Sequence, residues 1–410
     1  MDFRVLHVLD HSWPVLDGYS QRSRSIIDAQ KSFGWYPIVL TGPLHNIDDP
    51  TAAEIDLDSI RYFRTPRDSG FRGLAVHHRW PFLRECAVVN LLEKRILTLL
   101  DSHNFDVIHA HSPALCGLAA LRASRTRKLP FVYEIRSFWE DGVLQSPSSL
   151  KYRLARSLET YVVMRADAVV GIARPILQDL AERGAPEARL FHVPNGVDAS
   201  RFTPRRRDTV LAAQMGLTDV PTIGFLGTLF PWEGVAWLAH AAAALHARGV
   251  HFKMIIVGDG AEAAAIRAAI AEENAHDYVQ YLGRVPHEDV GRYYSIMDLL
   301  VYPRHSMRIT EFVTPLKPLE AMALAKPILG SAVGGIRELI DAGVTGLLFE
   351  PGNIDDFCRQ AKRMLESESL RTALGNAARA KVCQEKGWTT VTARYAEIYK
   401  TAIDNARPGS

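Results

Sequence analysis

The chain has 410 residues, of which 47% are hydrophobic and 23% charged, and its formal net charge is +2. A chain of this length exceeds one hydrophobic core and indicates two domains of similar size. The composition is typical of a globular protein, and the near-zero net charge argues against nucleic-acid binding. The four cysteines lack the spacing of a metal site, so we expect buried, reduced thiols.

The first residues lead directly into an apolar strand at 3–9, without the pattern of a secretory signal. No apolar run approaches the roughly 20 residues that a transmembrane helix needs. We therefore expect a cytoplasmic protein that meets a membrane, if at all, only from its surface.

Short apolar strands alternate with amphipathic helices along the chain, which is typical of parallel α/β sheets. In the first half we predict strands at 5–9, 38–40, 60–64, 107–109, 131–135, 168–172 and 190–193, and helices at 20–33, 82–100 and 150–165. A turn-rich stretch at 194–204 interrupts this alternation. The second half then predicts strands at 222–226, 252–257, 279–282, 299–302, 327–329 and 347–349, and a last helix from about 388 to 403.

This pattern predicts an α/β protein of two facing, Rossmann-like, doubly wound domains with parallel sheets. We place the first domain at 1–200 and the second at 201–387. Ligands of such sheets bind at the carboxyl ends of the strands, so facing domains would share a site in the cleft between them.

The segment TPLKPLEAMA, at 314–323, begins a helix with a cation and a carboxylate. Pro318 suits the first helical turn, where free N–H groups and the helix dipole favour a phosphate. Lys317 adds a positive charge, and Glu320 can accept hydrogen bonds from the two hydroxyls of a ribose. Glu320 could instead complement the helix N-terminus, but a capping box would need Ser or Thr where Lys317 stands. The segment therefore predicts a site for a nucleotide sugar.

Two glycine motifs lie in the same half of the chain. VGDGAEA at 257–263 matches the dinucleotide fingerprint and supports a rival interpretation, a nicotinamide-dependent enzyme. That fingerprint requires an acidic residue about 20 positions later, whereas the next strand ends at Arg284 without one, and a tight turn explains the glycines equally well. The second motif, Gly334-Gly335, supplies backbone N–H groups without an evident partner.

Two segments of the first half are candidates for ligand contact. Gly18 precedes a helix and would let the backbone approach a phosphate, although a plain turn explains it almost as well. His111 follows His109 at the end of a strand, where we expect it to point into the cleft. A core or surface role for these histidines is the alternative.

A third segment, YEIRSFWED at 133–141, ends another strand at the same edge. Glu134, Arg136 and Trp139 combine charge with an aromatic ring, which suits a hydroxylated acceptor, although a structural salt bridge would look identical. The chain shows no Ser-His-Asp pattern, HExxH, P-loop or convincing DxD metal pair. We therefore expect metal-independent catalysis through positioning and electrostatics.

These segments together resemble the family 4 retaining glycosyltransferases of the GT-B fold over nearly the whole chain. The resemblance is carried by DG at 17–18, HAH at 109–111, VPNGVD at 193–198, IGFLG at 223–227, VGDG at 257–260, LGRVP at 282–286, PLEAMA at 318–323 and GGIRE at 334–338. The segments 133–141 and 308–317 are similar to a branch associated with exosortase systems and exopolysaccharide clusters.

The resemblance implies a nucleotide-diphosphate sugar, a UDP- or GDP-sugar above all, held by the second domain, with no further cofactor. It implies a saccharide or lipid-linked acceptor on the first domain, and a terminal helix at 388–405 that packs back on that domain. The expected donor-binding residues are Gly18, Gly227, Thr228, Arg284, Val285, Arg308, Thr314, Pro315, Leu316 and Glu320. The expected catalytic residues are His111, Lys317 and Glu311.

The sequence departs from the family pattern in two places. Thr228 and Glu233 stand where the family usually has an Arg and a Lys on the diphosphate. The family's paired glutamates would place the first one position after Glu311. We infer that Arg308 and Lys317 supply the missing positive charge, and that Glu311 replaces the absent acid.

The resemblance implies a hexosyltransferase that retains the sugar's configuration, in the synthesis of an exopolysaccharide or cell-surface glycan. Two alternatives remain, a sugar-nucleotide epimerase or hydrolase of similar shape, and a non-catalytic nucleotide-binding assembly protein. The segment RWPFLR at 79–84 would let the protein dock on an anionic membrane surface, although a loop covering the first sheet is the alternative.

Overall fold

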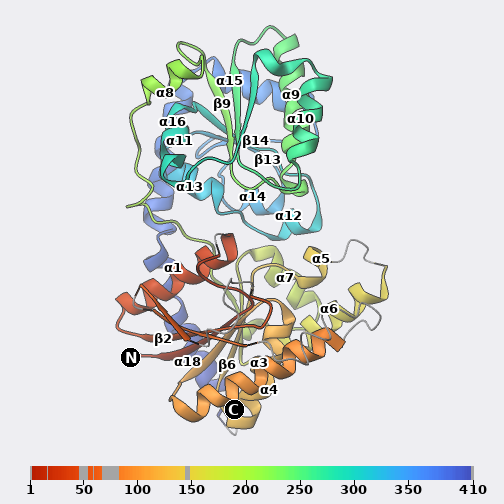
Figure 1. The fold of residues 1–410 in the computed structure, drawn as a ribbon, viewed down its shortest axis with the longest axis vertical. Coiled ribbons are helices and arrows are strands. Elements are labelled where there is room, and N and C mark those ends of the chain that lie inside the picture. Colours follow the sequence, from red (N-terminus) through yellow and green to blue (C-terminus); the bar gives the residue numbers. More distant parts are fainter. Residues whose placement is uncertain are drawn as a thin grey trace. The chain divides into compact units, whose positions relative to one another are not determined.

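The computed structural model describes residues 2–15, 17–45, 54–58, 60–66, 83–143 and 148–407. The chain divides into two compact units (Figure 1). The N-terminal unit comprises Met1–Pro194 and Trp388–Ser410, and the C-terminal unit comprises Asn195–Gly387. Each unit contains its own parallel sheet, and the units divide within the predicted turn-rich stretch.

The N-terminal unit alternates strands and helices as its sequence predicts. Its strands are β1 (Arg4–Leu9), β2 (Tyr36–Thr41), β3 (Glu54–Leu57), β4 (Ile60–Arg64), β5 (Val107–His111), β6 (Phe131–Ile135), β7 (Ala168–Gly171) and β8 (Leu190–His192). Its helices are α1 (Gly18–Ser32), α3 (Leu83–Ser102), α4 (Ala114–Arg127), α5 (Trp139–Val143), α6 (Leu150–Val163), α7 (Arg174–Glu182), the 3-10 helix η1 (Glu187–Arg189), α17 (Trp388–Thr392) and α18 (Tyr395–Asn405).

The strands of this unit form one sheet in the order β3-β4-β2-β1-β5-β6-β7-β8. The neighbours pair in parallel except β3, which runs antiparallel to β4. The sequence missed β3 because its Glu-Ile-Asp-Leu pattern lacks the apolar run that marks the other strands. The register places His7 of β1 opposite His109 of β5, and His111 opposite Glu134 of β6.

The last two helices complete the core of the N-terminal unit. Their apolar side chains pack in one cluster with residues of the first strands and of the loop before β2. The cluster joins Val391, Tyr395, Ile398, Tyr399 and Ala402 to Phe3, Val5, Ile26, Trp35, Val107, Val132, Ala168, Val170 and Val193. The rings of Phe3 and Tyr399 meet edge to face, with their centroids 5.4 Å apart. Burial of aromatic area of this size holds the chain's end on the first sheet.

The C-terminal unit repeats the strand-helix alternation. Its strands are β9 (Thr222–Leu226), β10 (Lys253–Val257), β11 (Val279–Gly283), β12 (Leu299–Tyr302), β13 (Ile328–Ser331) and β14 (Leu347–Phe349). Its helices are α8 (Thr209–Gln214), η2 (Pro231–Glu233), α9 (Val235–Ala247), α10 (Ala263–Glu272), η3 (Ala275–Asp277), η4 (His287–Asp289), α11 (Val290–Ile296), α12 (Arg308–Phe312), α13 (Lys317–Ala323), α14 (Gly334–Arg337), α15 (Ile354–Leu365) and α16 (Glu368–Glu385).

The six strands of this unit form a fully parallel sheet in the order β11-β10-β9-β12-β13-β14. Both faces are covered by helices, and the strands are therefore apolar along almost their whole length. The prediction of two doubly wound, Rossmann-like sheets is confirmed for each unit.

Two simpler predictions have different outcomes. Among the described residues, no helix combines the length and the apolar character that a transmembrane span requires. All four cysteines are free thiols, as expected, but only Cys116 and Cys358 are buried. The prediction of burial is wrong for Cys86 and Cys383, which are exposed. Both lie on helices, where the sequence alone gave no face.

Candidate active site

The strand order of the C-terminal unit creates a switch point between β9 and β12. These strands are neighbours, and the chain continues from β9 to β10 on one side and from β12 to β13 on the other. Ligands of open α/β sheets bind in the crevice that forms at the carboxyl ends of two such strands. The residues that follow the two strands are Gly227 and Thr228 after β9, and Pro303 and Arg304 after β12.

The side chain of Lys317 crosses the end of β9. Its ammonium nitrogen Nζ donates a hydrogen bond to the carbonyl oxygen of Thr228 at 3.2 Å and lies 5.3 Å from the centre of the Phe225 ring. This path requires a glycine beneath it. A Cβ on Gly227, whose φ is +146°, would lie 2.2 Å from Cε of Lys317. The glycine of the IGFLG motif thus makes room for the lysine of TPLKPLEAMA.

Glu233 pairs with two cations in this crevice. Its side chain is buried, and its Oε1 lies 3.2 Å from Nζ of Lys317 and 3.8 Å from Nη2 of Arg304. Burial lowers the pKa of Lys317, and the negative charge of Glu233 opposes that shift. Burial likewise lowers the pKa of Arg304 against the same carboxylate. Glu233 therefore compensates the positive charges that surround it, which explains a carboxylate where the family has a cation.

Glu311 is engaged with the protein through both carboxylate oxygens. Its Oε2 accepts a hydrogen bond from the Gly334 N–H at 2.6 Å, and its Oε1 accepts one from the hydroxyl of Ser306 at 2.7 Å. A Cβ on Gly334 would lie 2.3 Å from the carbonyl oxygen of Glu311, and one on Gly335 would lie 2.1 Å from that of Val313. The prediction of a partnerless N–H at Gly334 is wrong, because Glu311 caps it.

The backbone of the segment before α13 is fixed by a side-chain hydrogen bond. Thr314 is buried, and its carbonyl oxygen accepts a hydrogen bond from Nδ2 of Asn195 at 2.7 Å. Pro315 is buried, while Leu316, Lys317 and Glu320 are half-buried. Asn195 belongs to the VPNGVD motif, so this motif fixes the backbone that leads into TPLKPLEAMA.

Glu320 lies one turn into α13, above two buried phenols. Burial and the charge of Glu320 raise the pKa of Tyr302 well above its usual value. Burial, the neighbouring Tyr302 and Glu320 do the same for Tyr294. The hydroxyl of Tyr302 donates to the carbonyl oxygen of Lys317 at 3.1 Å. Two neutral phenols therefore support the start of the helix that carries Lys317 and Glu320.

The remaining predicted donor residues of the C-terminal unit differ in their exposure to solvent. Thr228 and Arg284 are exposed, and Val285 is half-buried behind β11. Arg308 begins α12, where its guanidinium lies over the ring of Phe312 at 4.4 Å from the ring centre. The cations that contact Glu233 in the crevice at β9 are Lys317 and Arg304.

The glycines of the VGDG motif have a structural explanation. Gly258 and Gly260 have φ values of +140° and +157°. A Cβ on Gly258 would lie 1.8 Å from the carbonyl oxygen of Gly227, and one on Gly260 would lie 2.4 Å from that of Leu229. The two loops that follow β9 and β10 therefore touch through backbone atoms. This close approach supports the tight-turn interpretation rather than a dinucleotide site.

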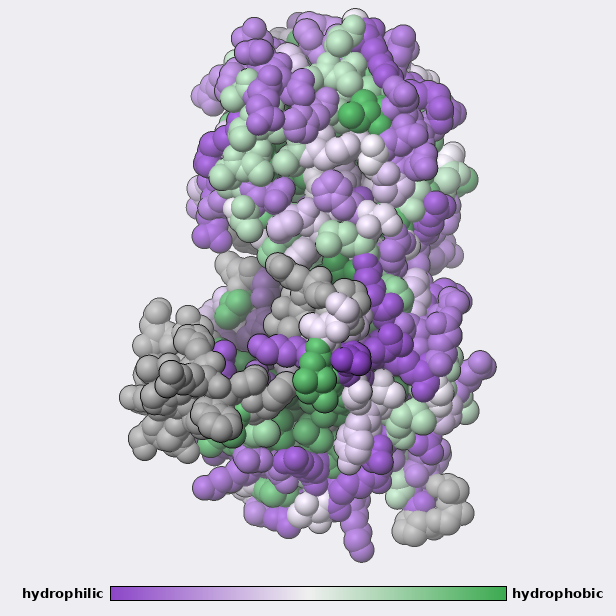
Figure 2. All heavy atoms as spheres, turned by 90° about the vertical axis from the view of Figure 1, so that its right-hand side faces the viewer, coloured by the Kyte–Doolittle hydropathy of each residue, from purple (hydrophilic) through white to green (hydrophobic). Residues whose placement is uncertain are grey.

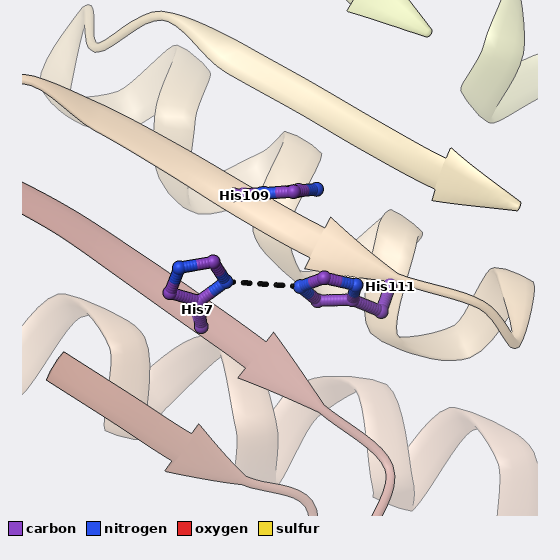
Figure 3. Close-up of side chains that lie close together, drawn as sticks. All are labelled: His7, His109 and His111. Atoms are coloured by element: carbon purple, nitrogen blue, oxygen red, sulfur yellow. Dashed lines mark hydrogen bonds between the residues drawn. The ribbon is translucent and has the colours of Figure 1, made fainter. Parts of the chain in front are cut away.

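In the N-terminal unit, three histidines gather at the corresponding switch point between β1 and β5. His7 projects from β1, and His109 and His111 from β5 (Figure 3). All three are buried. Nδ1 of His7 and Nε2 of His111 are hydrogen-bonded at 3.0 Å. His111, which we predicted to point into the cleft, is buried in this unit, and both of its ring nitrogens are engaged.

Arg136 determines the protonation of this chain of rings. Its Nη2 donates to Nδ1 of His111 at 2.8 Å, so Nδ1 must carry a lone pair and Nε2 must carry the hydrogen. Nε2 of His111 then donates to Nδ1 of His7, and Nε2 of His7 donates to Oε1 of Gln30 at 2.8 Å. Both rings are neutral. Burial lowers the pKa of His7 to about 3 and that of His111 well below its usual value.

His109 belongs to the same network from the other side. Nε2 of Gln30 donates to the hydroxyl of Tyr399 at 2.9 Å, and that hydroxyl is 2.9 Å from Nδ1 of His109. The hydroxyl therefore donates to Nδ1, which leaves the hydrogen on Nε2, 3.5 Å from Oε2 of Glu134. Burial lowers the pKa of His109 as well. Helix α18 thus supplies, through Tyr399, a hydrogen-bond partner to His109 on the central strand β5.

Glu134 is the centre of a buried ion cluster. Its Oε1 lies 3.0 Å from Nε of both Arg22 and Arg136, and its Oε2 accepts from the hydroxyl of Tyr395. Burial raises the pKa of Glu134, but the charges of Arg22 and Arg136 outweigh this and hold the pKa well below its usual range. The remaining donors of Arg136 reach the carbonyl of Tyr19 at 2.6 Å and the Ser23 hydroxyl at 2.8 Å.

The prediction of acceptor contacts at this strand end is therefore wrong for two of its three residues. Glu134 and Arg136 are buried in a structural salt bridge, the alternative that the sequence left open. Trp139 is half-buried at the start of α5. Gly18 is exposed at the start of α1, and Asp17 caps that helix by accepting from the Ser20 N–H at 2.8 Å. A carboxylate at this cap favours the plain-turn interpretation of Gly18.

The three histidines are also the group of described residues whose possible metal ligands gather most closely, within 4.8 Å of one another. The rings of His109 and His111 are stacked, with an interplanar angle of 26°, and those of His7 and His111 make 24°. A metal ion must lie in the plane of each ring on its lone pair, and rings stacked in nearly parallel planes do not share such a point. The lone pairs of His7 and His111 are already engaged, so we assign no metal here.

Sequence reasoning missed several members of both clusters. His7 interrupts an apolar strand, and Tyr395 and Tyr399 are spaced by one helical turn, which are signals of a buried polar contact. Nothing in the sequence around Arg22 or Arg304 predicts that these side chains are buried.

Models of known families match both units of the chain. The model described as "Glycosyl transferase 4-like domain" matches residues 17–196, and the model described as "Glycosyl transferases group 1" matches residues 211–381. This chain is a family 4 glycosyltransferase of the GT-B fold. It is accordingly a sugar-transferring enzyme, and the nicotinamide, epimerase and assembly-protein alternatives are set aside.

Relatives and solved structures agree with this assignment. A GDP-mannose-dependent alpha-mannosyltransferase of Mycobacterium tuberculosis is 28% identical to this glycosyltransferase over 297 residues, which cover 72% of this chain and 73% of the relative. The fold matches sucrose-phosphate synthase from Thermosynechococcus elongatus with a TM-score of 0.75, at 20% identity over 97% of this chain and 98% of that one. It also matches HepE of Anabaena, solved in complex with UDP, with a TM-score of 0.74 at 18% identity over 96% of this chain and 98% of that one.

Proposed function

We propose that this glycosyltransferase holds a nucleotide-diphosphate sugar with its C-terminal unit, at the carboxyl ends of β9 and β12, and its acceptor with the N-terminal unit. The observation that carries the proposal is the position of Lys317. Its ammonium group lies across Gly227 on the carbonyl of Thr228, where the family places an arginine on the diphosphate. The crevice therefore keeps a cation at the expected place by drawing it from a different element.

The hydrogen bonds of Lys317 leave it ready for a phosphate. An ammonium group has three donor hydrogens, and Thr228 and Glu233 engage two of them. The side chain remains 20% exposed, so the third can meet a phosphate oxygen. During transfer, negative charge builds on the departing diphosphate, and a preorganised cation lowers the energy of that state. We assign this role to Lys317, with Arg304 buried behind it.

Other residues of the C-terminal unit serve the same donor. Glu320 binds the ribose hydroxyls, and Arg284 and Val285 lie beside the base. Arg308 adds positive charge at the entrance to α12. Glu311 acts as a positioning residue, because its two oxygens fix Ser306 and Gly334 rather than facing solvent. His111, at the end of β5, likewise acts through its contacts, by orienting Arg136 at the end of β6.

The donor is a GDP- or UDP-sugar. The mannosyltransferase relative uses GDP-mannose by its name, and the HepE structure holds UDP. The sugar is transferred with retention and without a metal ion, to a saccharide or lipid-linked acceptor of exopolysaccharide or cell-surface glycan synthesis. The enzyme works in the cytoplasm, with peripheral contact with a membrane. Of the segment predicted for that contact, residues 79–82 lie outside the described residues.

Thermal unfolding with a panel of nucleotide sugars tests the proposal. GDP-mannose, UDP-glucose, ADP-glucose and dTDP-glucose are added, in the presence of a chelator, to wild type, Glu320→Ala and the control Glu385→Ala. A ligand at a hundred times its Kd adds about 2.7 kcal/mol to the stability of the folded state. We expect a GDP- or UDP-sugar to stabilise wild type and the control, and Glu320→Ala to lose the effect. Equal stabilisation of all three proteins, or none by any nucleotide sugar, would contradict the proposal.

A further inference from the structure

Helix α6 of the N-terminal unit exposes large apolar side chains on its outer face. Leu150 is 63% exposed, Leu154 42% and Tyr161 45%, and Met164, which caps the helix, is 39% exposed. The inner face is built differently, from the buried residues Tyr152, Ala155, Glu159, Val162 and Val163. The helix therefore packs on the core with one face and carries a second apolar stripe on the face toward solvent. A surface helix of a globular domain usually has polar side chains on that face.

Basic residues accompany this apolar stripe. Lys151, Arg153, Arg156 and Arg165 are exposed, and within the described residues none of the four forms an ion pair. The acidic residue of the helix, Glu159, is buried and accepts a hydrogen bond from the hydroxyl of Tyr133 at 2.5 Å. The outer face of α6 thus carries four positive charges and no negative one.

The C-terminal half of the helix also forms a shallow hollow between two arginines. The hollow has a volume of about 390 Å³ and is lined by Arg156, Ser157, Thr160, Tyr161, Met164 and Arg165. The guanidinium of Arg165 lies 3.8 Å from the centre of the Tyr161 ring, and Nη2 of Arg125 donates to the carbonyl of Arg165 at 2.7 Å. Guanidinium groups held beside apolar side chains suit a phosphate whose ester chain continues into apolar surroundings.

We propose that the outer face of α6 docks the enzyme on the surface of an anionic lipid bilayer. An amphipathic helix of this kind lies in the interface plane, with its apolar side chains among the upper acyl chains and its basic side chains on the lipid phosphates. A second copy of this chain is a poorer occupant. A twofold contact would place the same face against itself and oppose four positive charges with four more.

The location is consistent with the view in Figure 2. That view is from the side of the molecule on which α6 lies in Figure 1, and it shows hydrophobic side chains among hydrophilic ones on the surface of the N-terminal unit. The polar groups at the switch point of this unit are buried and are not part of the docking face.

The inference adds a surface to the proposed peripheral contact, and it is tested without sugar transfer. The full-length enzyme is sedimented with vesicles of phosphatidylcholine alone and of equal parts phosphatidylcholine and phosphatidylglycerol. The variants are Arg153→Glu with Arg156→Glu, Leu150→Ser with Leu154→Ser, and the control pair Lys362→Glu with Arg363→Glu, which makes the same charge change on the exposed face of α15.

We expect wild type and the control pair to bind the anionic vesicles and to release them at high salt. The charge reversal on α6 should weaken binding by more than about tenfold, since each basic residue near the surface contributes about fivefold. The leucine pair should bind the anionic vesicles more weakly than wild type at low salt, because its apolar contact with the acyl chains is removed. Circular dichroism melts check that each variant is folded.

The inference is overturned if wild type does not bind anionic vesicles. It is also overturned if the α6 charge-reversal variant binds them as tightly as wild type. A homodimer that the leucine pair dissociates, with vesicle binding unchanged, also overturns it and assigns the face to a second copy. Because donor binding in solution is measured separately, failure here leaves the proposed reaction untouched.

Discussion

Both units have a switch point between two central parallel strands, but the polar groups at these two points differ in burial. Between β1 and β5, the polar groups of the N-terminal unit are buried and paired within the unit, with Glu134 among two arginines and the histidines in neutral chains. Between β9 and β12, Lys317 keeps a fifth of its side chain exposed, and Thr228 beside it is exposed. The same crevice is thus sealed in one unit and ready for a ligand in the other.

The difference teaches that strand order gives the place for a site but not its occupant. In the N-terminal unit, α18 supplies the hydrogen-bond partners, because the hydroxyl of Tyr395 donates to Glu134 and that of Tyr399 to Nδ1 of His109. In the C-terminal unit, the counter-ion of Lys317 is Glu233, which ends the short 3-10 helix η2 that follows β9.

The largest effect is expected from breaking the sealed cluster. Glu134→Gln leaves Arg22 and Arg136 buried without their shared anion, which costs about 3–5 kcal/mol of the free energy of unfolding. Urea unfolding measures this loss. The control Glu397→Gln, on the exposed face of α18, should change stability by less than about 0.5 kcal/mol. If the two variants were equally stable, the ion cluster around Glu134 would not stabilise the N-terminal unit as we describe.

The second expected effect is a loss of stability in mild acid. The pKa of His7 is about 3 in the folded protein, whereas its ordinary value is 6.5, so below pH 6.5 the unfolded state binds a proton that the folded state does not. Stability therefore falls as the pH falls from 6.5, by about 1.4 kcal/mol per pH unit for this histidine alone. Burial shifts His109 and His111 in the same direction.

Urea midpoints of wild type and His7→Gln are compared below pH 6.5, because Glu159, whose pKa burial raises to about 8, contributes a slope of opposite sign to both proteins. Wild type should lose more stability per pH unit than His7→Gln as the pH falls. Equal slopes in the two proteins would mean that His7 is not the buried, neutral ring inferred from its contacts.

The smallest effect concerns the counter-ion in the open crevice. Glu233→Gln keeps an oxygen for Nζ of Lys317 but removes the negative charge beside the donor's diphosphate. We expect donor affinity near neutral pH to rise by about fivefold, the equivalent of about 1 kcal/mol. Because Glu233 raises the pKa of Lys317, the variant should lose donor affinity at a lower alkaline pH than wild type.

Calorimetric titration across pH 7 to 10 measures both effects, with the exposed Glu385→Gln as control. An affinity that drops at neutral pH, with an unchanged alkaline limb, would show that Glu233 does not act on the charge of Lys317.

The sequence predicted the parts of the fold that depend on local pattern. Apolar runs located nearly all the strands, and the unusual start of TPLKPLEAMA singled out Lys317 before its position was known. It could not predict which charges would pair, because Glu233 and Lys317 lie far apart along the chain and meet only through the strand order. For the same reason Glu134 looked like a substrate contact until Arg22 and Tyr395 were placed beside it.

The amphipathic stripe on α6 was hidden for a related reason. A periodic pattern of apolar residues predicts that a helix has an apolar face. When a helix has two sets of apolar residues, only the tertiary structure shows which set packs on the sheet. Once Tyr152 and Val162 are seen to be buried, Leu150 and Leu154 remain as a second set.

The most direct test of the central claim is the calorimetric affinity of wild type, Lys317→Ala and the control Lys362→Ala for GDP and UDP. A charge-assisted hydrogen bond to a phosphate contributes about 1.5–3 kcal/mol, so Lys317→Ala should bind its nucleotide roughly 10- to 150-fold more weakly, with Lys362→Ala unchanged. Equal affinity of Lys317→Ala and wild type would contradict the account, because the open crevice would then hold its diphosphate without the cation placed across Gly227.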